Sequence, residues 1–409
     1  MAISLEEVKL NDDIAYECLS YTWVGPKGGD TTNHRRMVCN NAVKYIQQNL
    51  YDILVQLRNS NILGPIWIDA LCINQGDISE RNSQVAQMGE IYKRAIRVIV
   101  WLGKEDGYTK TALESLERST LTLEDYERDK SSSLREHRRC PYTYDEDCAI
   151  LYFMVQRIWY SRLWVIQEIV LARDIIFFCG SHNTTIDTIW RGSLFIQYSD
   201  PDIQDDHNNL TEANFSFSFL AVCIFRHNRL RSPILNTIGY TVHLFRHAQS
   251  TDARDKVFGL LAISDCYNYH LQTTMKADYN ISTQQVYTSA AKFASCDSRN
   301  LAALAAVGDQ SLNQIISLSS WVPDLSVSQS LPPLEYLDTR FAAATQESYR
   351  LNWQDNALIL DGLLWDRISL SSESDSEIAN RKGVSRLLQV FNECGLRYAH
   401  SDDLLAKAI

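Results

Sequence analysis

The stretch Ile66–Leu102, IWIDALCINQGDISERNSQVAQMGEIYKRAIRVIVWL, decides the fold class of this chain. It opens with the apolar run Ile66–Ile68 and closes with Val98–Leu102, and both runs have the β-branched and aromatic character of strands covered on both faces. Between them, apolar residues recur at the three- and four-residue steps of one helix face: Val85, Met88, Tyr92 and Ala95. A strand, a helix and a second strand predict parallel pairing with a right-handed crossover. The chain is therefore predicted to be an α/β protein.

Polar residues follow the first of these strands. Asp69 and Asn74 lie just beyond it, and α/β proteins place their sites at the carboxyl ends of parallel strands. Asp77 or Ser79 is expected to cap the helix that comes next. This part of the chain therefore predicts both the local fold and one edge of a binding site.

Further segments extend the pattern on both sides. Tyr16–Tyr21 is predicted to be a strand, and Val43–Leu57 a helix. Cys148–Ala172 is predicted to be one helix, or two helices broken near Ser161, and Ile175–Cys179 a fourth strand. The sheet would then be largely parallel.

With 409 residues, the chain is predicted to form two domains. The acidic, turn-rich stretch Asp200–Asn209 is the preferred boundary, which gives domains at 1–200 and 201–409, and residues 104–147 are interpreted as a helix with a polar insertion. The second domain is predicted to be mainly helical, with a few late strands. Its expected elements are helices over Ile234–His247, Asp252–Ile263 and Thr283–Cys296, and strands near Trp321 and Leu358–Leu360.

Composition excludes several classes of protein. The formal net charge of −11 argues against broad nucleic-acid binding, and the short basic cluster Arg135–Arg139 is interpreted as a solvated loop. No stretch approaches the roughly 18 apolar residues that span a bilayer, and the first residues lack the pattern of a secretion signal. The ten cysteines are scattered without a C-x-x-C pair, which predicts reduced thiols and a cytoplasmic protein.

Four blocks of this sequence resemble the fungal heterokaryon-incompatibility (HET) domain family, in the family's order. They are Tyr16–Trp23, Trp67–Gly103, Arg157–Gly180 and Thr251–Leu261. Two departures are the extra residue in Trp23-Val24-Gly25 and Ala253 in place of a proline. The resemblance implies a role in nonself recognition and programmed cell death, with self-association or another incompatibility protein as the partner.

HET domains are distantly similar to TIR domains, so the resemblance implies a TIR-like, flavodoxin-like parallel sheet. Many TIR domains split NAD at the nicotinamide–ribose bond with one glutamate in a W-x-x-x-E pattern, and Trp164–Glu168 has that spacing. By this analogy Glu168 is the candidate catalytic residue, NAD is the substrate, and neither a permanently bound cofactor nor a metal is expected. A carboxylate beside the ribose would stabilise the positive charge that develops there. The implied binding residues are Ser20, Trp23, Asp69, Asn74 and Trp164.

Other readings stay open. Glu168 can instead be a structural partner of Arg162 or Arg157 in a non-catalytic signalling or oligomerisation module. Asp69 can organise a turn, and Trp164, like Trp159 and Trp67, can be a core aromatic. A third reading is a different enzyme on the same scaffold, for example in secondary metabolism, with a large pocket between the domains.

The remaining constellations favour structural roles. His243 and His247 have a zinc-like spacing but no third ligand, and Cys72 has no histidine in its block, which favours an inert thiol. Asp252 and Asp255 are interpreted as a helix cap with charge pairing. The chain has no Walker loop, G-x-G-x-x-G or G-x-S-x-G, which argues against a kinase, an ordinary dehydrogenase or a serine hydrolase.

Overall fold

The computed structural model forms two compact units, residues 1–348 and 349–409. The residues it describes are 1–10, 12, 14–23, 34–62, 64–128, 144–199, 213–231, 236–268, 273–297, most of 304–327, 351–354 and 357–360. The boundary predicted within 200–209 and part of the predicted insertion lie outside the described residues. The first unit includes described segments on both sides of that boundary, and the division at residue 200 stays a prediction.

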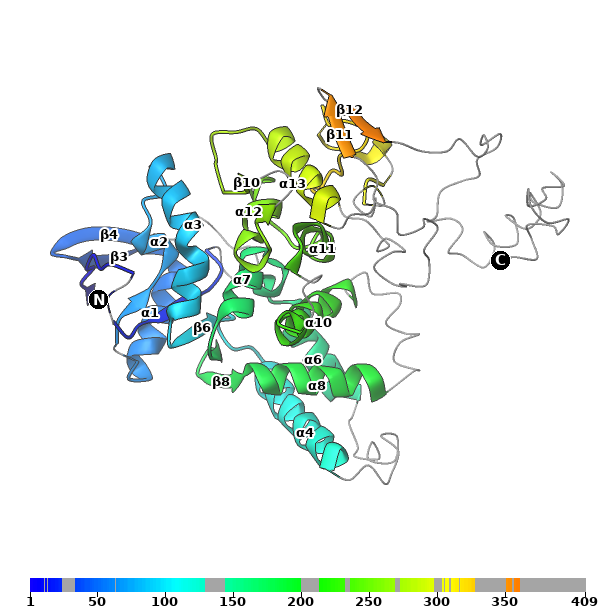
Figure 1. Ribbon diagram of the computed structural model, residues 1–409. Coiled ribbons are helices and arrows are strands. Elements are labelled where there is room, and N and C mark those ends of the chain that lie inside the picture. The colour runs from blue at the N-terminus through cyan, green and yellow to red at the C-terminus, as the bar shows by residue number, and fades with distance from the viewer. Residues whose placement is uncertain are drawn as a thin grey trace, which may run out of the picture. The chain divides into compact units, whose positions relative to one another are not determined.

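A five-stranded sheet organises the first unit, in the order β5-β2-β6-β7-β8. Figure 1 labels two of its strands, β6 and β8. Its strands are β2 (Glu17–Ser20), β5 (Ile66–Trp67), β6 (Arg97–Trp101), β7 (Ile175–Cys179) and β8 (His182–Thr185). The first four strands in this order, β5, β2, β6 and β7, pair in parallel, whereas β8 pairs antiparallel with β7. The α/β class is confirmed. If the five strands are numbered 1 to 5 along the chain, their order across the sheet is 2-1-3-4-5. This is the strand order of flavodoxin-like sheets.

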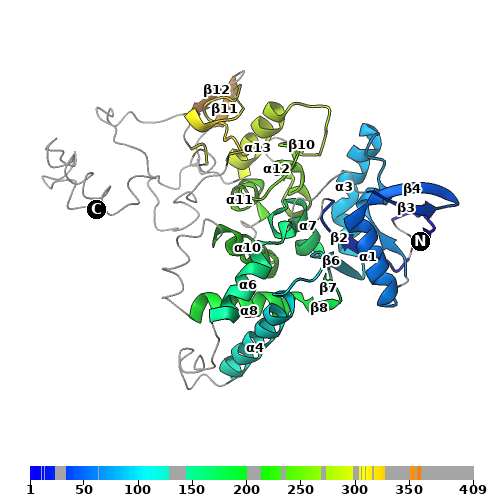
Figure 2. The same ribbon diagram turned by 180° about the vertical axis from the view of Figure 1, so that it is seen from behind.

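Helices cover both faces of this sheet. On one face, α1 (Gln48–Asn59) packs Leu50 and Ile53 against Leu19 and Ile99 of the strands. Figure 2 shows α1 beside the labels of β2 and β6. The opposite face meets α3 (Ile78–Arg94), which follows the short helix α2 (Asp69–Cys72). The side chain of Asp77 caps α3 by accepting hydrogen bonds from two backbone N–H groups, as predicted.

The predicted helix Val43–Leu57 is wrong in its first part. Residues His34–Cys39 (β3) and Ala42–Gln47 (β4) form an antiparallel hairpin, and α1 begins only at Gln48. Asn40 and Asn41 close it, with φ of 49° and 64°. Two successive positive φ values are those of a type I′ turn, which suits the twist of paired strands. The N-terminal strand β1 (Ala2–Ile3) pairs with β3 and completes a second, three-stranded sheet.

Between β6 and β7 the chain forms α4 (Thr109–Arg128), α6 (Tyr144–Val155), the 3-10 turn η1 (Ile158–Ser161) and α7 (Trp164–Leu171). The predicted break near Ser161 is confirmed. None of the helices that the structure describes has the length and apolarity needed to cross a bilayer.

The remaining elements of the first unit are mainly helical. They are α8 (Ile186–Ser199), α10 (Ala213–Asn228), α11 (Ile238–Leu244), α12 (Asp255–Phe258), η3 (Leu261–Ile263), β9 (Tyr267–Asn268), β10 (Thr273–Thr274), α13 (Thr283–Asp297) and η4 (Gln310–Leu312). The helix predicted over Asp252–Ile263 is reduced to α12 and η3, and Trp321 lies in a turn instead of a strand. The second unit contains the hairpin of β11 (Leu351–Gln354) and β12 (Ala357–Leu360). The strand predicted near Leu358–Leu360 corresponds to β12.

Helix α10 packs directly onto the core beside the sheet. The ring of Phe219 lies 5.0 Å from Tyr160 and 6.3 Å from Trp159, between ring centroids, and 6.2 Å from Phe177 of β7. The guanidinium of Arg226 donates hydrogen bonds to carbonyls at the C-terminal end of α7, where a cation also complements the helix dipole. Residues beyond 200 therefore help to hold α7 in place.

Candidate functional site

Glu168 lies at the carboxyl end of β2, beneath the surface. It projects from α7 with only 4% of its area exposed, and its Oε2 accepts a hydrogen bond from the hydroxyl of Ser20, the last residue of β2. The same hydroxyl accepts from the indole Nε1 of Trp159 at 2.8 Å. Because the hydroxyl has a single proton and Trp159 can only donate, that proton is directed at Glu168. Ser20, which is distant in sequence, and Trp159, from the turn just before α7, thus fix this carboxyl group.

Burial changes the acidity of this carboxyl. Removal from water raises the pKa of Glu168 to about 7, although the nearby charge of Arg162 and the hydrogen bond from Ser20 both lower it. The negative charge of Asp69 acts in the same direction as burial. A carboxyl with a pKa near neutrality can take up and release a proton at neutral pH, as an acid–base catalyst requires.

Trp23 and Asp69 form the outer part of the site. The indole Nε1 of Trp23 donates to Asp69 Oδ2 at 2.9 Å, and Trp23 is 40% exposed. The loop after β2 is anchored from α1, where the Asn49 amide donates to the backbone oxygen of Thr22 at 2.7 Å. Asn49 is itself oriented by the indole of Trp101, which donates at 2.9 Å. The carboxyl ends of β2 and β5 therefore meet as the sequence predicted.

Two further side chains complete the cluster. Arg162 donates to the backbone oxygen of Tyr21, so its positive charge is held beside the loop after β2. The hydroxyl of Tyr92 donates to the backbone oxygen of Leu19 at 3.3 Å and lies close enough to Glu168 to lower the pKa of that carboxyl. Tyr92 was predicted only as part of the apolar face of α3, and spacing alone contains no signal for this polar role.

Two of the residues expected at the site have contacts elsewhere. Asn74 is exposed and organises the turn before α3, where its Oδ1 accepts from the N–H of Gly76 at 3.2 Å. The indole of Trp164 donates to Asp255 Oδ2 at 3.1 Å. Neither residue is joined to Glu168 by a hydrogen bond among those described, so the cluster consists of Ser20, Trp23, Asp69, Tyr92, Trp159, Arg162 and Glu168.

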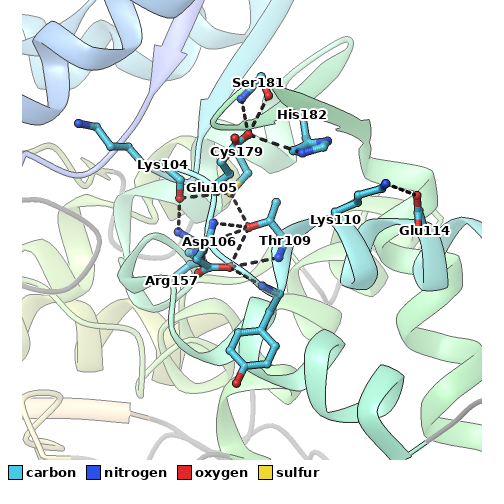
Figure 3. Close-up of polar contacts among 11 residues, drawn as sticks. Lys104, Glu105, Asp106, Thr109, Lys110, Glu114, Arg157, Cys179, Ser181 and His182 are labelled. Atoms are coloured by element: carbon cyan, nitrogen blue, oxygen red, sulfur yellow. Dashed lines mark hydrogen bonds and ion pairs between the residues drawn. The ribbon is translucent and has the colours of Figure 1, made fainter.

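Arg157 belongs to a separate network beyond the ends of β6 and β7 (Figure 3). Its side chain is 4% exposed and its Nη2 lies 2.7 Å from Asp106 Oδ2, while Nη1 donates to the Lys104 carbonyl at 2.9 Å. In the same view, Glu105 accepts from the Ser181 hydroxyl at 2.7 Å. Arg157 therefore has its own carboxylate partner and is not the ion-pair partner considered for Glu168.

The other candidate clusters have structural contacts. In the part of the chain that is described, no three His, Cys, Asp or Glu side chains gather as metal ligands do. Burial raises the pKa of Cys72, which disfavours a reactive thiolate. Asp252 pairs with Arg254 at 2.6 Å, whereas Asp255 is held by Trp164 and, at 2.5 Å, by the hydroxyl of Tyr279. A small, mainly apolar cavity, lined in part by Val242, His243 and Tyr287, shares no lining residue with the Glu168 cluster.

Residues 16–168 match the family model described as "Heterokaryon incompatibility protein (HET)". This segment of the chain is similar to HET domains. The matched segment begins beside β2 and ends at Glu168 itself, so it includes every residue of the cluster. The HET resemblance noted in the sequence is thereby confirmed.

A curated relative of this chain is "Heterokaryon incompatibility protein 6, OR allele" from Neurospora crassa. It is 30% identical over 200 residues, which cover 41% of this chain and 29% of the relative. The chain therefore matches less than a third of that protein's length. No solved structure matches the chain.

Proposed function

We propose that the chain acts in fungal heterokaryon incompatibility through its HET domain, and that this domain hydrolyses NAD at the nicotinamide–ribose bond. The incompatibility role is supported by the family match and by the name of the Neurospora relative. The observation that carries the enzymatic proposal is the Glu168 carboxyl, held by Ser20 at the carboxyl end of β2 with a pKa of about 7. The proposal includes programmed cell death as the outcome of NAD loss.

A TIR-like relationship is part of the same proposal. The flavodoxin-like strand order supports it, because ligands of such sheets bind at the point where the order reverses. Here that point lies between β2 and β6, next to Ser20. The W-x-x-x-E spacing of Trp164 and Glu168 supports it too, although Trp164 serves as an anchor to Asp255.

The chemistry balances without another reactant. When the bond between ribose C1′ and the pyridinium nitrogen breaks, its electron pair neutralises nicotinamide and positive charge develops on the ribose. Water then adds its oxygen to C1′ and releases one proton. An ionised Glu168 beside C1′ would stabilise the positive charge and receive that proton.

Access to Glu168 follows from the exposure of its neighbours. Because Glu168 is 4% exposed, the ribose reaches it only when neighbouring side chains part. The Trp23–Asp69 contact is the part of the cluster that faces solvent. Trp23 would then stack on the nicotinamide or adenine ring, and Asp69 would accept a hydrogen bond from a ribose hydroxyl.

A non-catalytic signalling module is the second candidate. It is favoured by the same burial, since a buried carboxyl that accepts a hydrogen bond from Ser20 also meets the requirements of a structural residue. In this case the domain would act by self-association or by binding another incompatibility protein, and NAD would not be consumed.

The deciding experiment compares wild type with Glu168→Gln, which keeps size and hydrogen bonding but removes the charge. Glu90→Gln is the matched control, because Glu90 is an exposed glutamate on α3. Loss of NAD and release of nicotinamide are measured at rising protein concentration and with a crowding agent, so that assembly is allowed. We expect wild type and the control to consume NAD, and Glu168→Gln to be at least about 100-fold slower. If folded wild type consumes none, even when forced to oligomerise, the signalling module replaces the enzyme.

A further inference from the structure

The hairpin of β3 and β4 leaves one edge of a sheet open. In the order β1-β3-β4, strand β4 pairs with β3 on one side, and no described strand pairs with its other side. Figure 1 shows the hairpin of β3 and β4 at the margin of the N-terminal region. A free edge exposes a row of backbone N–H and C=O groups to which another strand can bind.

The register shows which groups are free. In a hairpin with a two-residue turn, the flanking pair exchanges hydrogen bonds and the pairs then alternate. Cys39 and Ala42 are the flanking pair, and Met37 opposite Lys44 is the next pair that bonds. On β4, Val43 and Tyr45 alternate with these bonding residues. Their N–H and C=O groups therefore point to the open edge.

The side chains of β4 favour a protein strand as the occupant. Residues Ala42 to Tyr45 are all exposed, with Val43 at 48% and Tyr45 at 65%. Valine and tyrosine are residues that pair well across strands. A peptide added to an edge obtains affinity from backbone hydrogen bonds and specificity from such alternate side chains.

Charge defines the chemistry of the partner. Residues 34–47 contain His34, Arg35, Arg36 and Lys44 but no aspartate or glutamate, whereas the whole chain has a net charge of −11. A second copy pairing through the same strand would bring Lys44 of both copies onto facing strands, with Arg35 and Arg36 on the strand behind each, and like charges on facing strands destabilise pairing. We infer that β4 is a docking edge for an extended acidic segment of a partner protein, which adds a fourth strand to this sheet.

The test uses a proline substitution that acts on the open edge alone. Val43→Pro removes an N–H group that faces away from β3, a position where edge strands tolerate proline. Val43→Thr is the matched control, since it keeps both the N–H and the β-branched shape. A display library of random twelve-residue peptides is selected against the full chain, and the affinity of the most enriched peptide is then measured by fluorescence anisotropy.

We expect the enriched peptides to be acidic and rich in β-branched residues. Their affinity should fall about tenfold in Val43→Pro, remain within about twofold in Val43→Thr, and fall in Lys44→Glu. Thermal unfolding verifies that each variant is folded, and Tyr45→Ser is tested in place of Val43→Pro if proline unfolds the chain. The inference is overturned if no acidic peptide is enriched, or if folded edge variants bind as wild type does. Equal binding of a single-stranded oligonucleotide would also overturn it, in favour of a general anion-binding patch.

Discussion

Glu168→Gln is expected to remove a pH dependence of stability that the buried carboxyl creates. In the unfolded chain this carboxyl titrates near its ordinary pKa of 4.5, whereas burial raises its pKa to about 7 in the folded protein. Between these values the folded state binds more protons than the unfolded state. The free energy of unfolding therefore falls as the pH rises from about 4.5 to about 7.

The magnitude follows from the two pKa values. At about 1.4 kcal/mol for each pKa unit, the difference between 4.5 and about 7 corresponds to about 3 kcal/mol. Glutamine accepts the same hydrogen bond from Ser20 but does not titrate. The variant should therefore gain about 3 kcal/mol relative to wild type between pH 4 and pH 8.

Urea unfolding, followed by tryptophan fluorescence at several pH values across this range, measures the difference between the two proteins. Other buried groups, such as His243 and His247 with lowered pKa values, contribute equally to both and cancel in the difference. Glu90→Gln serves as the control for replacing an exposed glutamate by glutamine. A constant difference for Glu168→Gln would refute the argument that its carboxyl is held in a water-poor site.

Three further substitutions test the surroundings of the site by the same unfolding assay. Phe219→Ala removes a buried ring that packs on Trp159 and should cost about 3–5 kcal/mol; a cost below about 1 kcal/mol would mean that α10 is not part of this core. Asp106→Ala leaves the buried guanidinium of Arg157 without its carboxylate and should cost about 2–4 kcal/mol, whereas a neutral result would show that Arg157 finds other partners. Gly180→Ala should cost about 1–3 kcal/mol, because Gly180 has φ of +58° and an added Cβ would lie 2.6 Å from an oxygen of Glu105; wild-type stability would contradict the described turn.

The sequence predicted the central strands well because their burial leaves a strong pattern. Ile66–Ile68, Val98–Leu102 and Ile175–Cys179 are short runs of β-branched and aromatic residues, and each overlaps a strand of the sheet. The β3–β4 hairpin was missed because its strands are largely exposed and therefore lack an apolar run. Its turn uses Asn40-Asn41, a weaker signal than Asn-Gly.

The site could be predicted in part for a similar reason. Ser20, Trp23 and Asp69 come together because the carboxyl ends of parallel strands meet at one edge of the sheet. The position of Glu168 beside them was predicted only from the family resemblance. Sequence spacing could not show that the Trp159 indole orients Ser20, or that Trp164 is directed to Asp255, which lies 91 positions further along the chain.

The proposed docking edge and the proposed NAD site can be tested independently of each other. Loss of peptide binding in Val43→Pro, with NAD hydrolysis unchanged, would show that β4 selects partners without taking part in the chemistry. Loss of hydrolysis in Glu168→Gln, with peptide binding unchanged, would show the converse. The two variants can therefore be measured side by side.

The central claim is tested most directly by quantifying nicotinamide and ADP-ribose released from NAD by wild type, Glu90→Gln and Glu168→Gln. We expect equal amounts of the two products from wild type and the control, and almost none from Glu168→Gln. Product formation by Glu168→Gln at the wild-type rate would contradict a catalytic role for this carboxyl. No product from folded, assembled wild type would contradict NAD hydrolysis altogether.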